Sequence, residues 1–168
     1  MDSEATVTAF RRNTGELLWA IDANIPDDDD EAFGGGIAYA DGRLFVTTGF
    51  AQIFALDAES GKELWRKKAS GPMRAPPAVK SDRVFAITID NQLFAYSAKT
   101  GEKLWSHAGF SEVAGLLGGA SPAVSDGAVI APYSSGEVYA LRVENGRVLW
   151  SDNLTSSRRL DALSSLAD

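Results

Sequence analysis

The 168-residue sequence contains no cysteine and only one histidine. Without cysteine, disulfides, thiolate-bound metals and cysteine nucleophiles are excluded. The single histidine, His107, lies two residues after Trp105 in an expected strand. A zinc site or a catalytic triad has little support without a second histidine, so we expect His107 to be structural.

Long apolar runs and an excess of basic residues are also missing. No apolar stretch approaches the ~20 residues that span a bilayer, and the first four residues, Met-Asp-Ser-Glu, lack the basic start and apolar core of a signal peptide. The 16 Lys and Arg against 23 Asp and Glu disfavour nucleic acid as a partner. We therefore expect a cytosolic protein, or one whose export segment lies outside this sequence.

One acidic run is present, Asp27–Glu31, and three glycines follow it at positions 34–36. Five carboxylates in a row offer oxygen ligands for a hard cation such as calcium. They lack the alternate spacing and the turn glycine of a calcium loop. We expect a solvated, mobile loop here in preference to a metal site.

The most informative feature is a repeat that accounts for all four tryptophans. Residues 55–65 read Ala-Leu-Asp-Ala-Glu-Ser-Gly-Lys-Glu-Leu-Trp, and the spacing of their alanine, glycine and tryptophan returns three more times. The copies are Ala9, Gly15 and Trp19; Ala55, Gly61 and Trp65; Ala95, Gly101 and Trp105; and Ala140, Gly146 and Trp150. Successive tryptophans are 46, 40 and 45 residues apart, a period typical of propeller blades.

Each complete copy predicts a meander of four strands. We expect strands at 37–39, 44–48, 52–56 and 63–66; at 78–79, 83–89, 92–96 and 103–107; and at 123–124, 128–133, 137–141 and 147–150. Turn pairs such as Asp-Gly between apolar runs favour hairpins. Central strands are apolar at consecutive positions, so both faces of each sheet should be covered. Pro132 removes a ladder donor inside a strand, and we expect an edge or a bulge there.

These features predict an all-β protein, a β-propeller of four-stranded antiparallel blades with an incomplete ring. Most solenoid units are shorter, and the turn chemistry excludes helical repeats. We expect the end of a partial blade at 1–20, an acidic and glycine-rich loop at 21–36, and blades at 37–68, 76–108 and 121–152. An interaction loop is expected at 109–120 and a connection toward a further blade at 153–168.

Within the repeat, each residue type suits one task. The alanine leaves room for the large indole, and the glycine supplies the positive φ that closes a short loop. The tryptophan brings apolar surface to the outermost strand and should lock one blade against its neighbour. We therefore expect structural docking in place of cofactor stacking for Trp19, Trp65, Trp105, Trp150, Gly15, Gly61, Gly101 and Gly146.

The repeat, with its endings at residues 15–19, 101–105 and 146–150, resembles the tryptophan-docking repeat of the pyrroloquinoline-quinone-like propellers over nearly the whole chain. Two groups share that repeat: quinoprotein dehydrogenases and the non-catalytic BamB lipoproteins of outer-membrane β-barrel assembly. The dehydrogenase resemblance implies adjacent cysteines under the quinone, calcium ligands and a catalytic aspartate. The absence of cysteine disfavours a quinoprotein dehydrogenase. A sensor or carbohydrate-binding propeller is a third alternative without specific support.

The resemblance also implies a partner site. Residues 111–122 resemble the BamB loop that presents leucines and an arginine to the POTRA domains of the barrel-inserting subunit, and residues 156–168 resemble the next connection, whose acidic residues lie on the same face. The candidate partner-binding residues are Val113, Leu116, Leu117, Arg158, Asp161 and Asp168; Leu117 stands where the family pattern has arginine.

Two alternatives remain open for these candidates. Val113, Leu116 and Leu117 lie in a glycine-rich connection, where they form an exposed apolar patch or fold back as a plug over the propeller end. Arg158 and its neighbour Arg159 are partner contacts or ordinary solvated charges.

The expected function is a non-catalytic interaction scaffold without cofactor or metal. The resemblance implies the periplasmic face of the outer membrane, with a signal peptide and a lipidated cysteine upstream of residue 1. An incomplete ring exposes apolar blade faces and strand edges. We therefore also expect a homodimer through the terminal blades.

Overall fold

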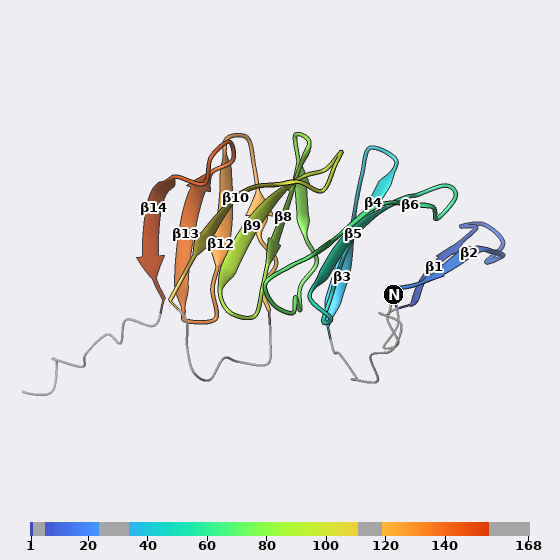
Figure 1. Ribbon diagram of the computed structural model, residues 1–168, viewed down its shortest axis with the longest axis horizontal. Coiled ribbons are helices and arrows are strands. Elements are labelled where there is room, and N and C mark those ends of the chain that lie inside the picture. Colours follow the sequence, from blue (N-terminus) through green and yellow to red (C-terminus); the bar gives the residue numbers. More distant parts are fainter. Residues whose placement is uncertain (2–5, 24–33, 111–118, 155–168) are drawn as a thin grey trace, which may run out of the picture.

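The computed structural model describes residues 1, 6–23, 34–110 and 119–154, and all regular structure in these ranges is β-strand. Three four-stranded antiparallel sheets and one two-stranded hairpin stand side by side in chain order (Figure 1). Within the described ranges, no helix is long and apolar enough to cross a membrane. The arrangement is that of successive propeller blades, and the predicted incomplete β-propeller is confirmed.

Each four-stranded sheet is a meander, because its strands are neighbours in the same order as in the sequence. The hairpin comprises β1 (Thr6–Phe10) and β2 (Leu17–Asp22). The first sheet comprises β3 (Gly35–Ala40), β4 (Arg43–Thr48), β5 (Gln52–Asp57) and β6 (Glu63–Lys68). The second comprises β7 (Ala78–Lys80), β8 (Arg83–Ile87), β9 (Gln92–Ser97) and β10 (Lys103–Ala108). The third comprises β11 (Ala123–Val124), β12 (Ala128–Pro132), β13 (Glu137–Arg142) and β14 (Val148–Asn153).

Strand β8 ends two residues earlier than expected, at Ile87 instead of Ile89. The N–H of Ile89 donates to the carbonyl of Pro72 in the connection between the first two sheets, and the N–H of Asn91 donates to Thr88 and closes a turn. Backbone groups that bond to a connection or a turn are not free for the sheet, so pairing stops before them.

The two faces of each central strand pack against different neighbours. In β5, Ile53 and Ala55 belong to the core shared with the second sheet, whereas Phe54 and Leu56 belong to the core shared with the hairpin. A third core joins the second and third sheets. Because side chains alternate between faces, a strand covered on both sides is apolar at consecutive positions. This explains the unbroken apolar runs.

The alanine of the repeat lies between two large side chains in one row across the sheet. Ala55 is paired with Phe45 on one side and with Trp65 on the other, and the ring centroids of Phe45 and Trp65 are 6.1 Å apart across it. The second sheet repeats the arrangement around Ala95, with a distance of 5.8 Å between the Phe85 and Trp105 centroids. A larger residue than alanine would separate the two rings.

Pro132 lies in β12, whose register with β13 is unbroken, so no bulge forms there, but on the β11 side Pro132 lies at a local edge of the sheet, as expected. The N–H of the next residue, Tyr133, donates to Glu137 of β13. Because donors alternate sides along an antiparallel strand, the Pro132 nitrogen faces the β11 side. The pairing with β11 reaches only to Ile130. The missing N–H therefore breaks no bond of the sheet.

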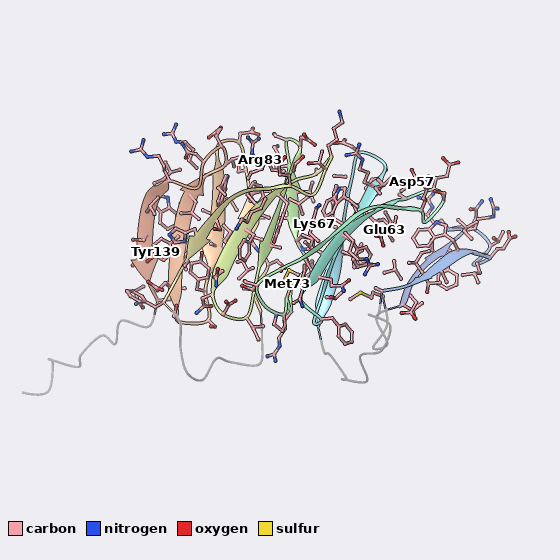
Figure 2. The ribbon with its side chains drawn as sticks, in the orientation of Figure 1. Asp57, Glu63, Lys67, Met73, Arg83 and Tyr139 are labelled. Carbon is pink, nitrogen blue, oxygen red and sulfur yellow. The ribbon has the colours of Figure 1, made fainter. Side chains whose placement is uncertain are left out.

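The two ends of the sheets differ in what they carry. We call the end with the β4–β5, β8–β9 and β12–β13 turns (residues 49–51, 88–91 and 133–136) the connection end, because the chain also passes from sheet to sheet there. It is the lower end in Figure 1. Figure 2 shows Met73 near this end and Asp57 near the opposite one.

Candidate functional site

All six candidate partner-binding residues, Val113, Leu116, Leu117, Arg158, Asp161 and Asp168, lie outside the described residues, as does the acidic run Asp27–Glu31. Described residues next to these segments do lie at the connection end. The backbone N–H of Leu154 donates to Gly136 in the β12–β13 turn, and Gly119 packs against Arg74 of the connection between the first two sheets. The connection end is therefore the candidate functional site.

The most exposed large apolar side chains in the described ranges flank the candidate segments. Leu154 is 74% exposed and Phe110 is 71% exposed. Phe110 directly precedes the segment 111–118, and Leu154 directly precedes the segment 155–168. Large apolar side chains held in water at one end of a rigid fold are a feature of protein-binding surfaces.

The backbone of Phe110 is held on both of its polar atoms by side chains from two sheets. Its N–H donates to Glu137 Oε2 at 2.8 Å, and its carbonyl accepts from Asn91 Nδ2 at 2.8 Å. Asn91 also accepts from the N–H and the hydroxyl of Ser134. Asn91 and Glu137 are buried, and buried hydrogen bonds to a charged group are strong. The point where the segment 111–118 begins is therefore fixed.

Buried polar residues elsewhere at this end also hold the connections. In the described part of the chain, the buried polar side chains are Thr47, Thr48, Thr88, Asn91 and Glu137, and all border turns of the connection end. The hydroxyl of Thr47 donates to the carbonyl of Ala75 at 2.8 Å. The N–H of Met73 donates to the carbonyl of Thr48. Because buried polar groups need partners, these contacts anchor the chain between sheets.

Sequence reasoning missed Asn91 and Glu137 as functional candidates. Glu137 begins β13 at the position where the other two sheets have Gln52 and Gln92. Glu137 is the one charged residue at these three equivalent positions, and it is buried whereas Gln52 and Gln92 are half-buried. This difference from the glutamines is visible in the sequence, but a single glutamate without a second acidic residue does not indicate a catalytic or metal site.

His107 joins the same cluster from β10. Its Nδ1 lies 2.9 Å from the Tyr133 hydroxyl, and its ring centroid lies 4.6 Å from that of Tyr139. Tyr139 is labelled on the third sheet in Figure 2. Burial lowers the pKa of His107, and the Glu137 carboxylate partly opposes this. His107 therefore packs as a neutral ring between two sheets.

Glu137 remains ionised in the fold. Burial alone would raise the pKa of Glu137, but the hydrogen bonds from Phe110, Tyr139 and Ser135, together with His107, hold it below the ordinary glutamate value. Tyr139 donates to Oε1 at 2.8 Å and Ser135 donates to Oε2 at 3.1 Å. Each bond favours the charged carboxylate.

The pKa values of His107 and Glu137 are lower in the folded protein than in the unfolded chain. As the pH falls, the unfolded chain therefore binds protons first, and we expect the free energy of unfolding to decrease in acid. The loss should begin near the ordinary histidine pKa of about 6.5 and continue below the ordinary glutamate pKa of about 4.3. Glu137→Gln should lower the free energy of unfolding at pH 7 by about 1–3 kcal/mol and flatten the acid part of the curve. Denaturation from pH 3 to 8 measures this.

The exposed Glu144→Gln serves as the matched control, and its profile should follow that of the unchanged protein. Equal acid profiles for Glu137→Gln and the unchanged protein would contradict the role assigned to Glu137.

A cavity of about 450 Å³ opens at the connection end between the second and third sheets. Its wall includes Arg74, Ala75, Ile87, Thr88, Ile89, Asn91, Gly119, Ala120, Pro132, Tyr133, Ser134 and Gly136. Most of the side chains among these described residues are apolar, and none of these residues is a carboxylate or a histidine. Such a hollow suits an apolar side chain better than an acid–base reaction.

The second feature of the molecule is a tryptophan contact at each junction between sheets. A side chain at Gly61, Gly101 or Gly146 would place its Cβ 2.7, 2.5 or 2.6 Å from the indole of the preceding repeat, namely Trp19, Trp65 or Trp105. Those distances are too short for any Cβ, so only glycine permits the contact. The glycine and the tryptophan of one repeat thus serve two different junctions.

The indole N–H completes two of these contacts. Trp65 Nε1 donates to the carbonyl of Ala98 at 3.0 Å, and Trp105 Nε1 donates to the carbonyl of Val143 at 3.0 Å. Each acceptor lies three residues before the contacted glycine. Trp19 Nε1 is buried without a hydrogen-bond partner among the described residues. The junction of the hairpin with the first sheet therefore rests on packing alone at this point.

In the described residues, no three or more His, Asp or Glu side chains gather as metal ligands. The four-stranded meanders and the tryptophan contacts between them define a propeller of the pyrroloquinoline-quinone-like repeat class. Residues 3–168 match the family described as outer membrane protein assembly factor BamB. The chain belongs to this family.

Individual relatives agree with this assignment. BamB of Salmonella typhimurium is 32% identical over 171 residues, which cover 99% of this chain and 44% of the relative. The crystal structure of BamB from Moraxella catarrhalis has the same fold, with a TM-score of 0.79 and 23% identity over 91% of this chain and 45% of that one. A europium-containing methanol dehydrogenase is also similar in fold, with a TM-score of 0.68 and 20% identity over 88% of this chain and 38% of that one. The chain spans less than half the length of the curated relatives it matches.

Proposed function

We propose that the chain acts as a non-catalytic scaffold in outer-membrane protein assembly, on the periplasmic side of the membrane. Its connection end binds the POTRA domains of the barrel-inserting subunit. The family contributes the assembly role, and the resemblance of residues 111–122 contributes the partner. The carrying observation is Phe110, whose ring is exposed to solvent while its backbone is fixed between two sheets.

Fixed geometry favours binding at this end. An apolar side chain on an anchored backbone loses less conformational freedom on binding than one on a free chain end. Phe110 supplies an aromatic anchor that precedes Val113, Leu116 and Leu117 in the sequence, and Leu154 supplies a second apolar side chain that precedes Arg158, Asp161 and Asp168. An apolar centre with charged residues at its rim is the usual composition of a protein interface.

An oxidoreductase is the alternative, and the fold of the europium-containing methanol dehydrogenase favours it. Quinone or metal chemistry needs donor side chains that converge on one place. The sequence has no cysteine, and the described residues bring together no group of three potential metal ligands. The donors that do converge at the connection end, around Glu137, are occupied with the backbone of Phe110 and with neighbouring hydroxyls. The scaffold is therefore the better supported function.

The decisive experiment replaces the two leucines by aspartate, Leu116→Asp together with Leu117→Asp. Immobilised POTRA domains should capture the unchanged chain but bind the double variant at least about 30-fold more weakly, because charges replace apolar anchors. Surface plasmon resonance measures the affinity, and circular dichroism verifies that the sheets remain folded.

Leu104→Asp, at an exposed leucine of β10, is the matched control and should leave capture unchanged. Unchanged capture by the double variant would contradict the proposal. A lower unfolding midpoint with unchanged capture would instead identify the two leucines as an internal plug.

A further inference from the structure

The cavity between the second and third sheets lies where the first strand of each sheet stops short. In the first sheet, β3 pairs with β4 through Thr47. In the second sheet, β7 pairs with β8 only as far as Phe85, and in the third, β11 pairs with β12 only as far as Ile130. Two residues beyond those points, at the position of Thr47, are Ile87 and Pro132, and both line the cavity. The lengths of two strands therefore leave this space.

The backbone of Ile87 and Pro132 is directed to the same uncovered side. The N–H groups of the residues that follow them, Thr88 and Tyr133, donate to β9 and β13. Because backbone groups of successive residues alternate sides along an antiparallel strand, those of Ile87 and Pro132 face the β7 and β11 sides, beyond the ends of these two strands. An extended peptide can bond to such an edge as an added strand.

The junction between the first and second sheets fills the corresponding place with Met73. This side chain is fully buried in the core of that junction, and the N–H of Met73 donates to the carbonyl of Thr48. Thr88 is the counterpart of Thr48, because each hydroxyl bonds to the carbonyl of the glutamine four residues later, and Thr88 lines the cavity. Figure 2 shows Met73 at the connection end. The cavity therefore has the place of an apolar side chain that comes from outside the sheets.

The charge of the wall adds a second condition for the occupant. Arg74 is the one charged residue among the described residues of the cavity wall, and the others are apolar or neutral. A half-buried guanidinium beside apolar surface favours a carboxylate as its partner. The occupant should therefore carry an acidic group next to its apolar side chain.

We propose that this cavity binds an extended peptide segment in which a large apolar side chain, that of methionine, leucine or phenylalanine, has an acidic residue beside it. The apolar side chain fills the hollow, the peptide backbone bonds along Ile87 and Pro132, and the carboxylate pairs with Arg74. The volume of about 450 Å³ lies in the range of ligand pockets. This is a second binding activity of the chain and does not depend on POTRA binding.

Fluorescence anisotropy with labelled peptides tests the proposal on the 168-residue chain. The peptides have the sequence Gly-Ser-Asp-X-Asp-Ser-Gly, with methionine, leucine or phenylalanine at X, and should bind. Serine at X should weaken binding at least about tenfold, because the burial of an apolar side chain is lost. Asparagine in place of both aspartates should weaken binding about two- to fivefold, and added salt should reduce that difference.

A variant of the protein that fills the cavity provides an independent test. Ala120 is exposed and lines the cavity, so Ala120→Trp blocks the hollow without disturbing a core. It should weaken binding of the methionine peptide at least about tenfold. Ala20→Trp, at an exposed alanine of β2, is the matched control and should bind like the unchanged chain. Circular dichroism verifies that both variants are folded.

Binding of none of the three apolar peptides, equal binding of the serine peptide, or unchanged binding by Ala120→Trp would each overturn the proposal. The double variant Leu116→Asp with Leu117→Asp tests a competing occupant. If it binds the methionine peptide at least about tenfold more tightly than the unchanged chain, the cavity belongs to this chain's own segment 111–118, and the proposal fails. The assay contains no POTRA domain, so peptide binding and POTRA capture can fail independently.

Discussion

Replacement of Trp65 by alanine is expected to lower the free energy of unfolding by about 3–5 kcal/mol, the usual cost of removing a buried tryptophan. Trp65 is 8% exposed. It packs against Phe45 in its own sheet and on Gly101 in the next, and its indole N–H bonds to the carbonyl of Ala98. The substitution removes all of these contacts and leaves a cavity at a junction.

Guanidinium denaturation measures this loss through the transition midpoint and its slope. Trp150→Ala is the comparison, measured at the same protein concentration. Because half of that residue is exposed, its removal should lower the free energy of unfolding by only about 1–2 kcal/mol. Similar losses for the two variants would show that the tryptophan contact between sheets is unimportant.

Gly101→Ala should destabilise the protein far more than Gly42→Ala, although both glycines have nearly the same φ, 69° and 72°. The left-handed backbone costs either alanine about 1–2 kcal/mol. At Gly101 the added methyl group also lies 2.5 Å from Trp65 Cε3, and such overpacking costs about 1–3 kcal/mol more.

The difference in the free energy of unfolding between these two variants separates the cost of blocking the indole contact from the cost of straining the turn. Urea or guanidinium denaturation of both proteins gives it directly. If the two substitutions cost the same, the glycine is needed only for its own turn, and the indole contact tolerates a side chain.

The junctions and the connection end have related roles in the proposed function. Indoles packed on glycine turns fix each sheet against the next, and this keeps Asn91 of the second sheet in place beside Glu137 of the third. These two residues in turn fix Phe110. A change at Trp105, in the middle of β10, would therefore affect the position of Phe110 through the relative position of the two sheets.

Much of the fold could be predicted because its signals are local. Turn pairs such as Asp41 and Gly42 mark hairpins, and apolar residues at consecutive positions mark strands covered on both faces. Pro132 shows the limit of local reasoning. The cost of its missing N–H depends on how far β11 extends beside it, and that is a property of another strand.

The candidate site was less predictable for the same reason. Glu137 and Asn91 come from different sheets and meet only at the backbone of Phe110. Neither residue belongs to a motif. Their role depends on burial. Water cannot reach the buried carboxylate and amide, so these groups must form their hydrogen bonds within the protein.

The sequence by itself determined the repeat, the meanders and the need for glycine and tryptophan at constant spacing, because hydrogen bonding within a turn and alternation along a strand act over a few residues. Only the tertiary structure decided which glycine each tryptophan contacts. Trp65 and Gly101 are 36 residues apart, and Trp105 and Gly146 are 41 apart. They meet because two sheets pack face to face, and that packing is set by the apolar surfaces of whole sheets acting together.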